Sequence, residues 1–83
     1  MSQREIVKKT LESVFVAAQI EVLDPRGDDR HLEAIVISSQ FEGLSLIKQH
    51  QLVMDALKNH FNEGLHALQL KTYTPDAWNA RSN

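Results

Sequence analysis

The sequence predicts an α+β domain, in which helices pack on a three-stranded mixed sheet, as a single unit over residues 1–83. Apolar residues recur at helical spacing near the N-terminus and again in the middle of the chain. Three short stretches have the alternation or the β-branched content of strands. A chain of 83 residues has room for one modest core and no second one. We therefore expect the order α-β-β-α-β-α, with the central helical segment in one or two pieces.

The first half of the chain predicts a helix followed by a hairpin. Ser2 and Glu5 have the spacing of a capping box, and apolar residues follow at helical intervals, so a helix is expected over residues 3–18. Residues 20–23 alternate and predict a strand, and residues 31–38, rich in isoleucine and valine, predict another. The seven residues between them, Asp-Pro-Arg-Gly-Asp-Asp-Arg, have the composition of a turn. The two strands should form an antiparallel hairpin with a long polar loop.

The second half predicts a helix, a strand and a short last helix. Residues 44–62 carry apolar side chains at helical spacing, and Gly64 stands where a C-cap glycine belongs. Residues 65–72 alternate and predict the third strand. Residues 74–78, Thr-Pro-Asp-Ala-Trp, supply an N-cap, a proline at the first helical position and an acid in the first turn. The last helix should lay its tryptophan over the edge of the core.

The order of elements brings two histidines to one edge of the sheet. A long helical crossover joins the second and third strands, and such connections make parallel strands. His31 begins one of these strands and His66 begins the other. Their separation is about 5 Å if the strands are neighbours and about 10 Å if the first strand lies between them. Position 66 shares its parity with Leu68 and Leu70, so His66 is expected at the head of an inward-facing apolar row.

Composition excludes several classes of function. With 9 basic and 11 acidic residues the formal charge is −2, which argues against a protein whose main role is to grip phosphates. There is no cysteine, so this chain alone builds no disulfide, thiolate nucleophile or cysteine-ligated cluster. No catalytic triad and no phosphate-binding glycine loop is present, and an enzyme is not expected. Without an apolar run near the ~20 residues of a membrane span, or a signal region at the start, the expected location is the cytoplasm.

The histidines and the loop aspartates are the residues to weigh for metal chemistry. His31 and His66 together are a plausible half-site for a borderline or soft metal, although a packing role at the sheet edge is the simpler alternative for each. His50 falls on the apolar stripe of the central helix and is expected to be partly buried and hydrogen-bonded. His60, near the end of that helix, is expected to be solvated. The loop aspartates lack the spacing of a calcium loop and suit turn positions.

Three segments taken in order resemble the BolA family: residues 31–38, 41–53 and 65–78. They contain the Phe-x-Gly entry, the helix histidine, the histidine of the third strand and the Thr-Pro-x-x-Trp ending. The resemblance implies a class II KH-like fold, αββααβα. It also implies a non-enzymatic partner of a monothiol glutaredoxin, which shares a [2Fe–2S] cluster in a heterodimer for iron homeostasis or for trafficking or sensing of iron–sulfur clusters.

The resemblance also implies a set of ligands. In BolA-like heterodimers the glutaredoxin cysteine and a glutathione thiol supply sulfur, while the BolA protein supplies a C-terminal histidine and a residue of the hairpin loop. The first maps onto His66; the second, cysteine or histidine in the family, maps best onto His31. Imidazoles in place of thiolates raise the potential of such a cluster. An adaptor that touches glutaredoxin without sharing a cluster is a further possibility.

The family is also linked to DNA binding and transcription regulation, which is the alternative function. It would use the helix-turn-helix-like residues 41–61, with Lys48, His50 and Lys71 as candidate contacts. The family commonly has Arg-His-Arg around its helix histidine, whereas residues 49–51 here are Gln-His-Gln. The loss of two cations weakens a phosphate-binding surface. The G-x-x-G loop that clamps RNA in other KH domains is absent as well.

Overall fold

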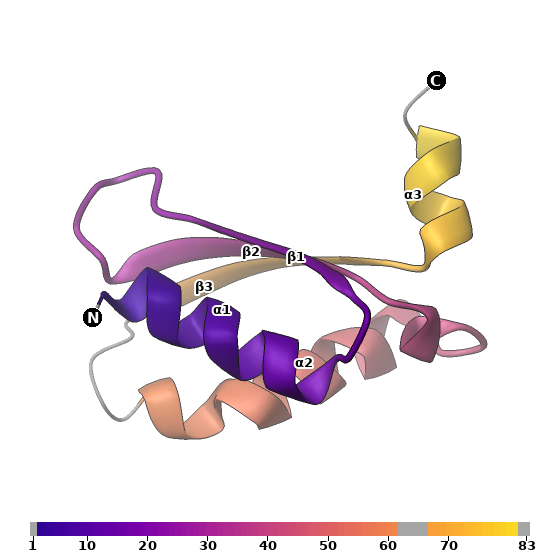
Figure 1. The fold of residues 1–83 in the computed structure, drawn as a ribbon, viewed down its shortest axis with the longest axis horizontal. Coiled ribbons are helices and arrows are strands. Elements are labelled where there is room, and N and C mark those ends of the chain that lie inside the picture. The colour runs from indigo at the N-terminus through magenta and orange to yellow at the C-terminus, as the bar shows by residue number, and fades with distance from the viewer. Residues whose placement is uncertain (1, 62–66, 82–83) are drawn as a thin grey trace.

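The computed structural model describes residues 2–61 and 67–81, which form a layer of helices against a three-stranded sheet. In chain order the elements are α1 (Gln3–Val14), β1 (Gln19–Leu23), β2 (His31–Ile37), the 3-10 helix η1 (Ser39–Phe41), α2 (Leu46–Phe61), β3 (Ala67–Tyr73) and α3 (Pro75–Arg81). Helices α1 and α2 lie on the same face of the sheet, and α3 stands away from them beyond the end of β3 (Figure 1). The predicted α+β class and element order are confirmed.

The sheet has the order β1-β2-β3, with β1 antiparallel and β3 parallel to β2. Both predicted strand directions are therefore confirmed, and β2 and β3 are immediate neighbours. In the parallel pair His31 is the partner of Ala67, and the Ala67 backbone N–H donates to the Arg30 carbonyl at 3.0 Å. The beginning of β3 is thus fixed beside the end of the β1–β2 loop.

Helix α1 begins as predicted and ends earlier than predicted. Ser2 is its N-cap, and the Ser2 hydroxyl accepts from the Glu5 N–H at 3.2 Å. The helix ends at Val14 instead of continuing to residue 18: Phe15 leaves the helical region with a ψ of 80°, and Ala17 follows in the left-handed region with a φ of 63°. This turn leaves Phe15 buried in the core, where its ring lies 5.4 Å from that of Phe41. Packing of one aromatic side chain thus overrides a helical pattern.

The central segment comes in two pieces. The short helix η1 begins after Ser38, whose hydroxyl accepts from the Gln40 N–H, and it buries Phe41. Gly43 follows with a φ of 78°, a conformation that suits glycine, and α2 then runs unbroken. The first of the two consecutive helices in the αββααβα order corresponds to η1. The expected C-cap at Gly64 lies outside the described residues.

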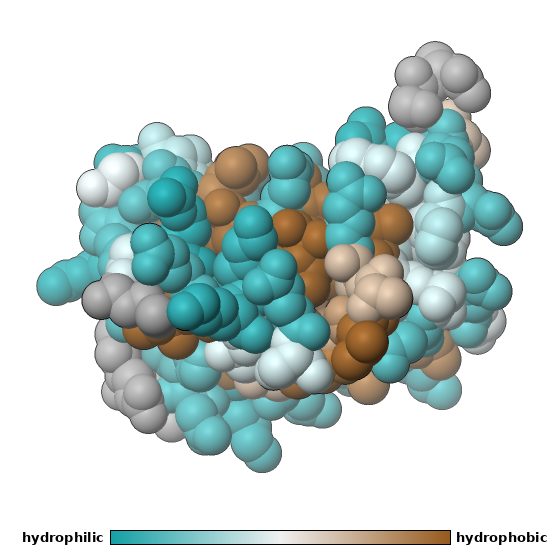
Figure 2. Space-filling model, viewed as in Figure 1, coloured by the Kyte–Doolittle hydropathy of each residue, from teal (hydrophilic) through white to brown (hydrophobic). Residues whose placement is uncertain are grey.

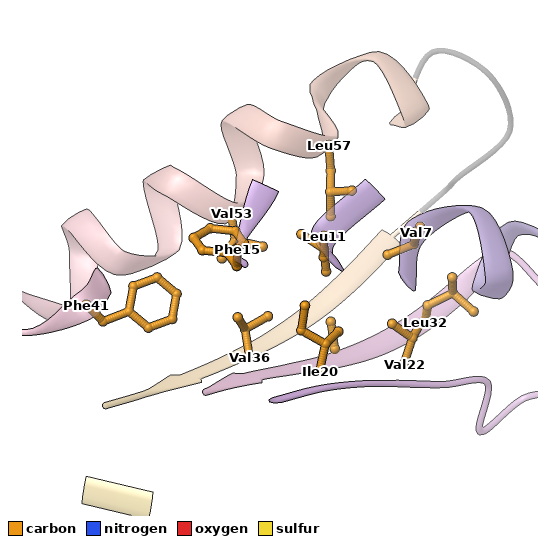
Figure 3. Close-up of a cluster of buried hydrophobic side chains, with 11 residues drawn as sticks. Val7, Leu11, Phe15, Ile20, Val22, Leu32, Val36, Phe41, Val53 and Leu57 are labelled. Atoms are coloured by element: carbon orange, nitrogen blue, oxygen red, sulfur yellow. The ribbon is translucent and has the colours of Figure 1, made fainter. Parts of the chain in front are cut away.

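The core lies between the helical layer and the inner face of the sheet, where side chains from β1 and β2 meet those of α1, η1 and α2 (Figure 3). Inward positions alternate with outward ones along each strand, as the period of two requires. Leu68 and Leu70 are half-buried and pack on this cluster, which confirms the parity predicted for the third strand. The buried set is Val7, Leu11, Phe15, Ile20, Val22, Leu32, Ala34, Val36, Phe41, Val53 and Leu57.

The opposite face of the sheet is more open. Glu21, Ile35 and Lys71 form one row across the strands there, with only Ile35 partly buried. In the space-filling view α1 presents a largely hydrophilic surface, and apolar side chains show along the line of the sheet above it (Figure 2). None of the helices in the described part of the chain is long and apolar enough to cross a membrane.

The C-terminal helix packs on β3 and not on the core. The Trp78 ring lies 5.2 Å from the Tyr73 ring in an edge-on arrangement, and the Arg81 guanidinium lies 3.5 Å above the Trp78 ring. No described residue of α3 is buried. The helix itself was predicted correctly, but the placement of Trp78 over the edge of the core was wrong, because α3 turns away from the helical layer (Figure 1).

Candidate functional site

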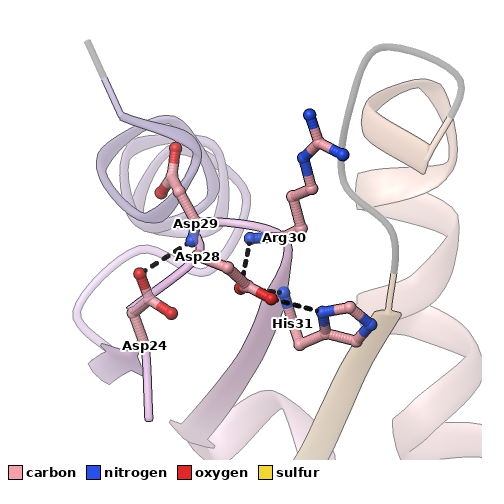
Figure 4. Close-up of polar contacts among 5 residues, drawn as sticks. All are labelled: Asp24, Asp28, Asp29, Arg30 and His31. Atoms are coloured by element: carbon pink, nitrogen blue, oxygen red, sulfur yellow. Dashed lines mark hydrogen bonds and ion pairs between the residues drawn. The ribbon is translucent and has the colours of Figure 1, made fainter. Parts of the chain in front are cut away.

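The β1–β2 loop is tied to the start of α1 by Asp29. Its carboxylate accepts from the backbone N–H of Gln3 at 2.7 Å and of Arg4 at 3.1 Å, so it satisfies two of the donors that a helix N-terminus leaves unpaired. Asp29 has a φ of 59°, and its own N–H donates to the Asp24 carboxylate at 2.9 Å (Figure 4). The aspartates act as turn residues, as the sequence predicted; the capping of α1 by Asp29 was not predicted.

The next aspartate holds His31. One oxygen of Asp28 accepts from the backbone N–H groups of Arg30 and His31, at 2.9 and 3.0 Å. The other lies 2.7 Å from His31 Nδ1, as Figure 4 shows. The N–H groups of Arg30 and His31, and then the His31 ring, hold the pKa of the Asp28 carboxyl well below its usual value. Because an ionised carboxylate only accepts hydrogen bonds, His31 Nδ1 carries the proton in this pair.

His31 lies at the rim of a hollow of about 210 Å³ where β2 and β3 begin, and its side chain is 32% exposed. The hollow is lined by Pro25, Arg26, His31, Leu32, Glu33, Ala67 and Gln69. His66, the other predicted ligand, lies outside the described residues, so its distance from His31 stays a prediction. Within residues 2–61 and 67–81, no three histidine, aspartate or glutamate side chains are grouped to hold a metal ion.

The three candidate DNA contacts, Lys48, His50 and Lys71, line two different hollows. His50 and Lys71 line a second hollow, of about 220 Å³, beside the edge strand β3. Lys48 lines a third hollow, of about 360 Å³, whose lining also contains Asp55. The structure therefore brings His50 together with Lys71 but leaves Lys48 apart from them.

His50 differs from expectation in its hydrogen bonding. It is half-buried on α2, as predicted, but Nε2 is shielded from solvent and has no hydrogen-bond partner among the described residues. The predicted hydrogen bond is wrong for this atom. An unpaired buried polar atom costs about 1–3 kcal/mol, so His50 is a residue that packing alone does not explain.

Gln49, the residue before it, has a structural role that sequence reasoning missed. It is buried; its amide nitrogen donates to the Leu44 carbonyl at 3.0 Å, and its oxygen accepts from the Thr72 hydroxyl at 2.7 Å. It therefore joins the start of α2 to β3 and does not face solvent. The signal was the spacing: Gln49 lies four residues before Val53 and eight before Leu57, both fully buried.

His60 is also more involved than predicted. Its Nε2 lies 2.9 Å from the Thr10 hydroxyl and links α2 to α1. The single hydroxyl proton of Thr10 goes to the Ile6 carbonyl, at 2.8 Å, so His60 Nε2 is the donor in this contact. The prediction of a solvated histidine is wrong, because the end of α2 packs along α1.

Comparison with known proteins identifies the fold. The family model described as BolA-like protein matches residues 3–77. The chain belongs to the BolA family. The solved structure of BolA1 from Arabidopsis thaliana superposes on this chain with a TM-score of 0.83 at 26% identity, over 92% of this chain and 95% of that one. The three helices and the mixed sheet seen here match those of BolA structures.

Two curated relatives extend the comparison. An uncharacterised protein of Rickettsia prowazekii is 40% identical over 68 residues, which are 82% of this chain and 88% of the relative. The protein named DNA-binding transcriptional regulator BolA from Haemophilus influenzae is 30% identical over 89 aligned positions, covering 99% of this chain and 86% of the relative. The family is thus shown along nearly the whole chain.

Proposed function

We propose that this BolA protein is a non-enzymatic partner of a monothiol glutaredoxin and shares a [2Fe–2S] cluster with it, in iron homeostasis or in cluster trafficking or sensing. His31 and His66 are the ligands it contributes. The observation that carries the proposal is the His31 imidazole, held by Asp28 at the end of the sheet where β3 begins. A histidine whose other ring nitrogen donates to a carboxylate is the usual arrangement of a metal-binding histidine.

The donor chemistry of the chain fits such a cluster as one half of its ligand set. Two imidazoles on one iron are the ligands of Rieske-type centres. This chain has no cysteine, so the sulfur ligands belong to the glutaredoxin cysteine and a glutathione thiol. When bound, the cluster supplies one-electron chemistry or is itself passed on. The chain's own task is to hold its imidazoles at the shared site.

The register limits where the cluster sits. His31 is paired with Ala67 and shares the open face with Glu33 and Gln69, while Leu68 and Leu70 point to the core. His66, which directly precedes Ala67, is expected to have the parity of the leucines. Because the two imidazoles belong to opposite faces of the sheet, both can bind one cluster only at the end of the sheet, beside the hollow that His31 lines.

Anaerobic co-expression with a monothiol glutaredoxin tests the proposal through the visible absorption and circular dichroism spectra. The heterodimer should give a spectrum different from that of the glutaredoxin homodimer, and His31→Ala and His66→Ala should each remove the difference. His50→Gln is the matched control, because His50 lines the second hollow, beside the later residues of β3, and not the hollow that His31 lines. A mixture that keeps the homodimer spectrum, or a heterodimer spectrum unaffected by His66→Ala, contradicts the proposal.

DNA binding is the second candidate function, favoured by the relatives named as DNA-binding transcriptional regulators. In this chain it would use the hollow that His50 and Lys71 share. Lysines contacting phosphates make affinity fall steeply with salt, at about one power of salt concentration per contact. Titration of duplex DNA at several salt concentrations tests this candidate: wild type should show such a slope, and Lys71→Gln should reduce it by about one. A weak and flat response removes the candidate.

A further inference from the structure

We propose that Asp28 is a positioning residue that selects which ring nitrogen of His31 meets the shared cluster: Nδ1 donates to Asp28, and Nε2 binds iron. The inference rests on the proposed function and adds a residue to it. Asp28 touches no iron in this account; it acts only through His31.

The Asp28 carboxylate is held in place by backbone groups, independently of the His31 ring. One Asp28 oxygen is occupied by two backbone N–H groups, those of Arg30 and His31. That leaves the second oxygen for His31 Nδ1, at 2.7 Å. The backbone N–H groups of Arg30 and His31 thus fix the orientation of the Asp28 carboxylate. If the His31 ring turned over, Nδ1 would move away from this carboxylate and the hydrogen bond would break.

The segment carrying Asp28 is also held from both sides. Asp29, the next residue, caps the N-terminus of α1 through Gln3 and Arg4. The Asp29 N–H is in turn held by Asp24 at the start of the loop. The N-terminus of α1 therefore holds Asp29, and the adjacent Asp28 holds the His31 ring (Figure 4). Such a supporting shell is what holds a ligand side chain to one geometry.

Selection of the nitrogen matters because a neutral imidazole has one donor and one acceptor nitrogen, and only the acceptor binds a metal. With the proton on Nδ1, the lone pair is on Nε2. Asparagine at position 28 makes the opposite choice. Its side-chain oxygen keeps the two backbone N–H donors, so its amide group faces His31 Nδ1 and donates to it, which moves the proton of the ring to Nε2.

The first experiment needs no cluster. Long-range ¹H–¹⁵N NMR spectra of the free protein, recorded at a pH at which histidine is neutral, report the tautomer of each ring. Wild type should show His31 with its proton on Nδ1, Asp28→Asn should move it to Nε2, and the control Asp76→Asn, in the first turn of α3, should leave it on Nδ1. A wild-type ring protonated on Nε2, or a tautomer unchanged by Asp28→Asn, overturns the inference.

The second experiment measures how fast a chelator removes iron from the glutaredoxin heterodimer. Loss of an orienting partner typically costs about 10–100-fold in metal affinity, and Asp28→Asn should weaken cluster retention by that order. In the background of His31→Cys the same substitution should have little effect, because a thiolate has no tautomer to select. Equal losses in both backgrounds mean that Asp28 merely shapes the loop, and they overturn the positioning role.

The two proposals fail in different ways. If His31→Ala and His66→Ala leave the heterodimer spectrum unchanged, the proposed function fails whatever the tautomer of His31. If both substitutions abolish the spectrum but His31 binds through Nδ1, or Asp28→Asn retains the cluster as wild type does, then the shared cluster stands and the role of Asp28 is refuted.

Discussion

Asp29 should be the residue that couples the ligand loop to the stability of α1, and a series of three substitutions separates its contributions. Asp29→Gly removes the carboxylate but suits the φ of 59°. The part-buried bond to Gln3 is charge-assisted, and such bonds contribute about 1.5–3 kcal/mol. The bond to Arg4 is longer and exposed and should add little. We expect a loss of about 2 kcal/mol for Asp29→Gly, or roughly 8–16 °C in Tm for a domain of this size.

The other two substitutions test that assignment. Asp29→Asn keeps one acceptor oxygen, for the Gln3 N–H, and tolerates the left-handed region. It should lose the weak bond to Arg4 and the favourable interaction of the charge with the helix N-terminus, which is about 0.3–1 kcal/mol. Asp29→Ala loses the bonds and adds the cost of a left-handed alanine, about 1–2 kcal/mol more than Asp29→Gly. Urea denaturation and thermal unfolding give all three values. The reasoning is refuted if Asp29→Gly unfolds within 0.5 kcal/mol of wild type, a bound of roughly half an ordinary hydrogen bond, or if asparagine is as damaging as alanine.

Three further predictions concern residues near the candidate sites. Thr72→Val, which is nearly isosteric, leaves the buried Gln49 oxygen without its 2.7 Å donor and should lower the free energy of unfolding by about 1–3 kcal/mol in urea denaturation; an unchanged midpoint would contradict this. His50→Leu removes a buried unpaired nitrogen and should be at least as stable as wild type by thermal unfolding, so a clear loss of stability would mean that Nε2 is paired in solution. The N–H groups of Arg30 and His31 lower the pKa of Asp28 from 3.8, so the ionised carboxylate stabilises the folded state above about pH 4, and this stabilisation is lost as the pH falls below that. Unfolding measured at a series of acid pH values should therefore show the difference in stability between wild type and Asp28→Asn narrowing below about pH 4. A difference independent of pH would refute this prediction.

The fold was predictable where local signals and topology agree. The capping box at Ser2 and Glu5 sets the start of α1, and the helical crossover sets the parallel pairing of β2 with β3. The failures are places where tertiary packing decides. Burial of Phe15 ends α1 early, and α3 turns outward, so Trp78 packs on Tyr73 and not on the core.

The candidate site was predictable only in part, for the same reason. His31 was identified by its place at the start of a strand and by resemblance to the family. Its bond to Asp28 is local, three residues apart, and was within reach of the sequence. The tie from Asp29 to α1 spans 26 residues and needs the fold. The buried amide of Gln49 shows the limit of comparing motifs: the exchange of arginine for glutamine there concerns an interior contact to Thr72 and not a phosphate-binding surface.

The central claim is that two histidines of this chain bind one iron of a shared cluster, and pulsed electron paramagnetic resonance of the reduced heterodimer tests it most directly. Labelling only this chain with ¹⁵N-histidine should reveal two strongly coupled imidazole nitrogens. His31→Cys, which keeps a ligand at that position, should leave only the nitrogen of His66. A spectrum with no strongly coupled nitrogen from this chain, in a heterodimer that still contains the cluster, would contradict the account.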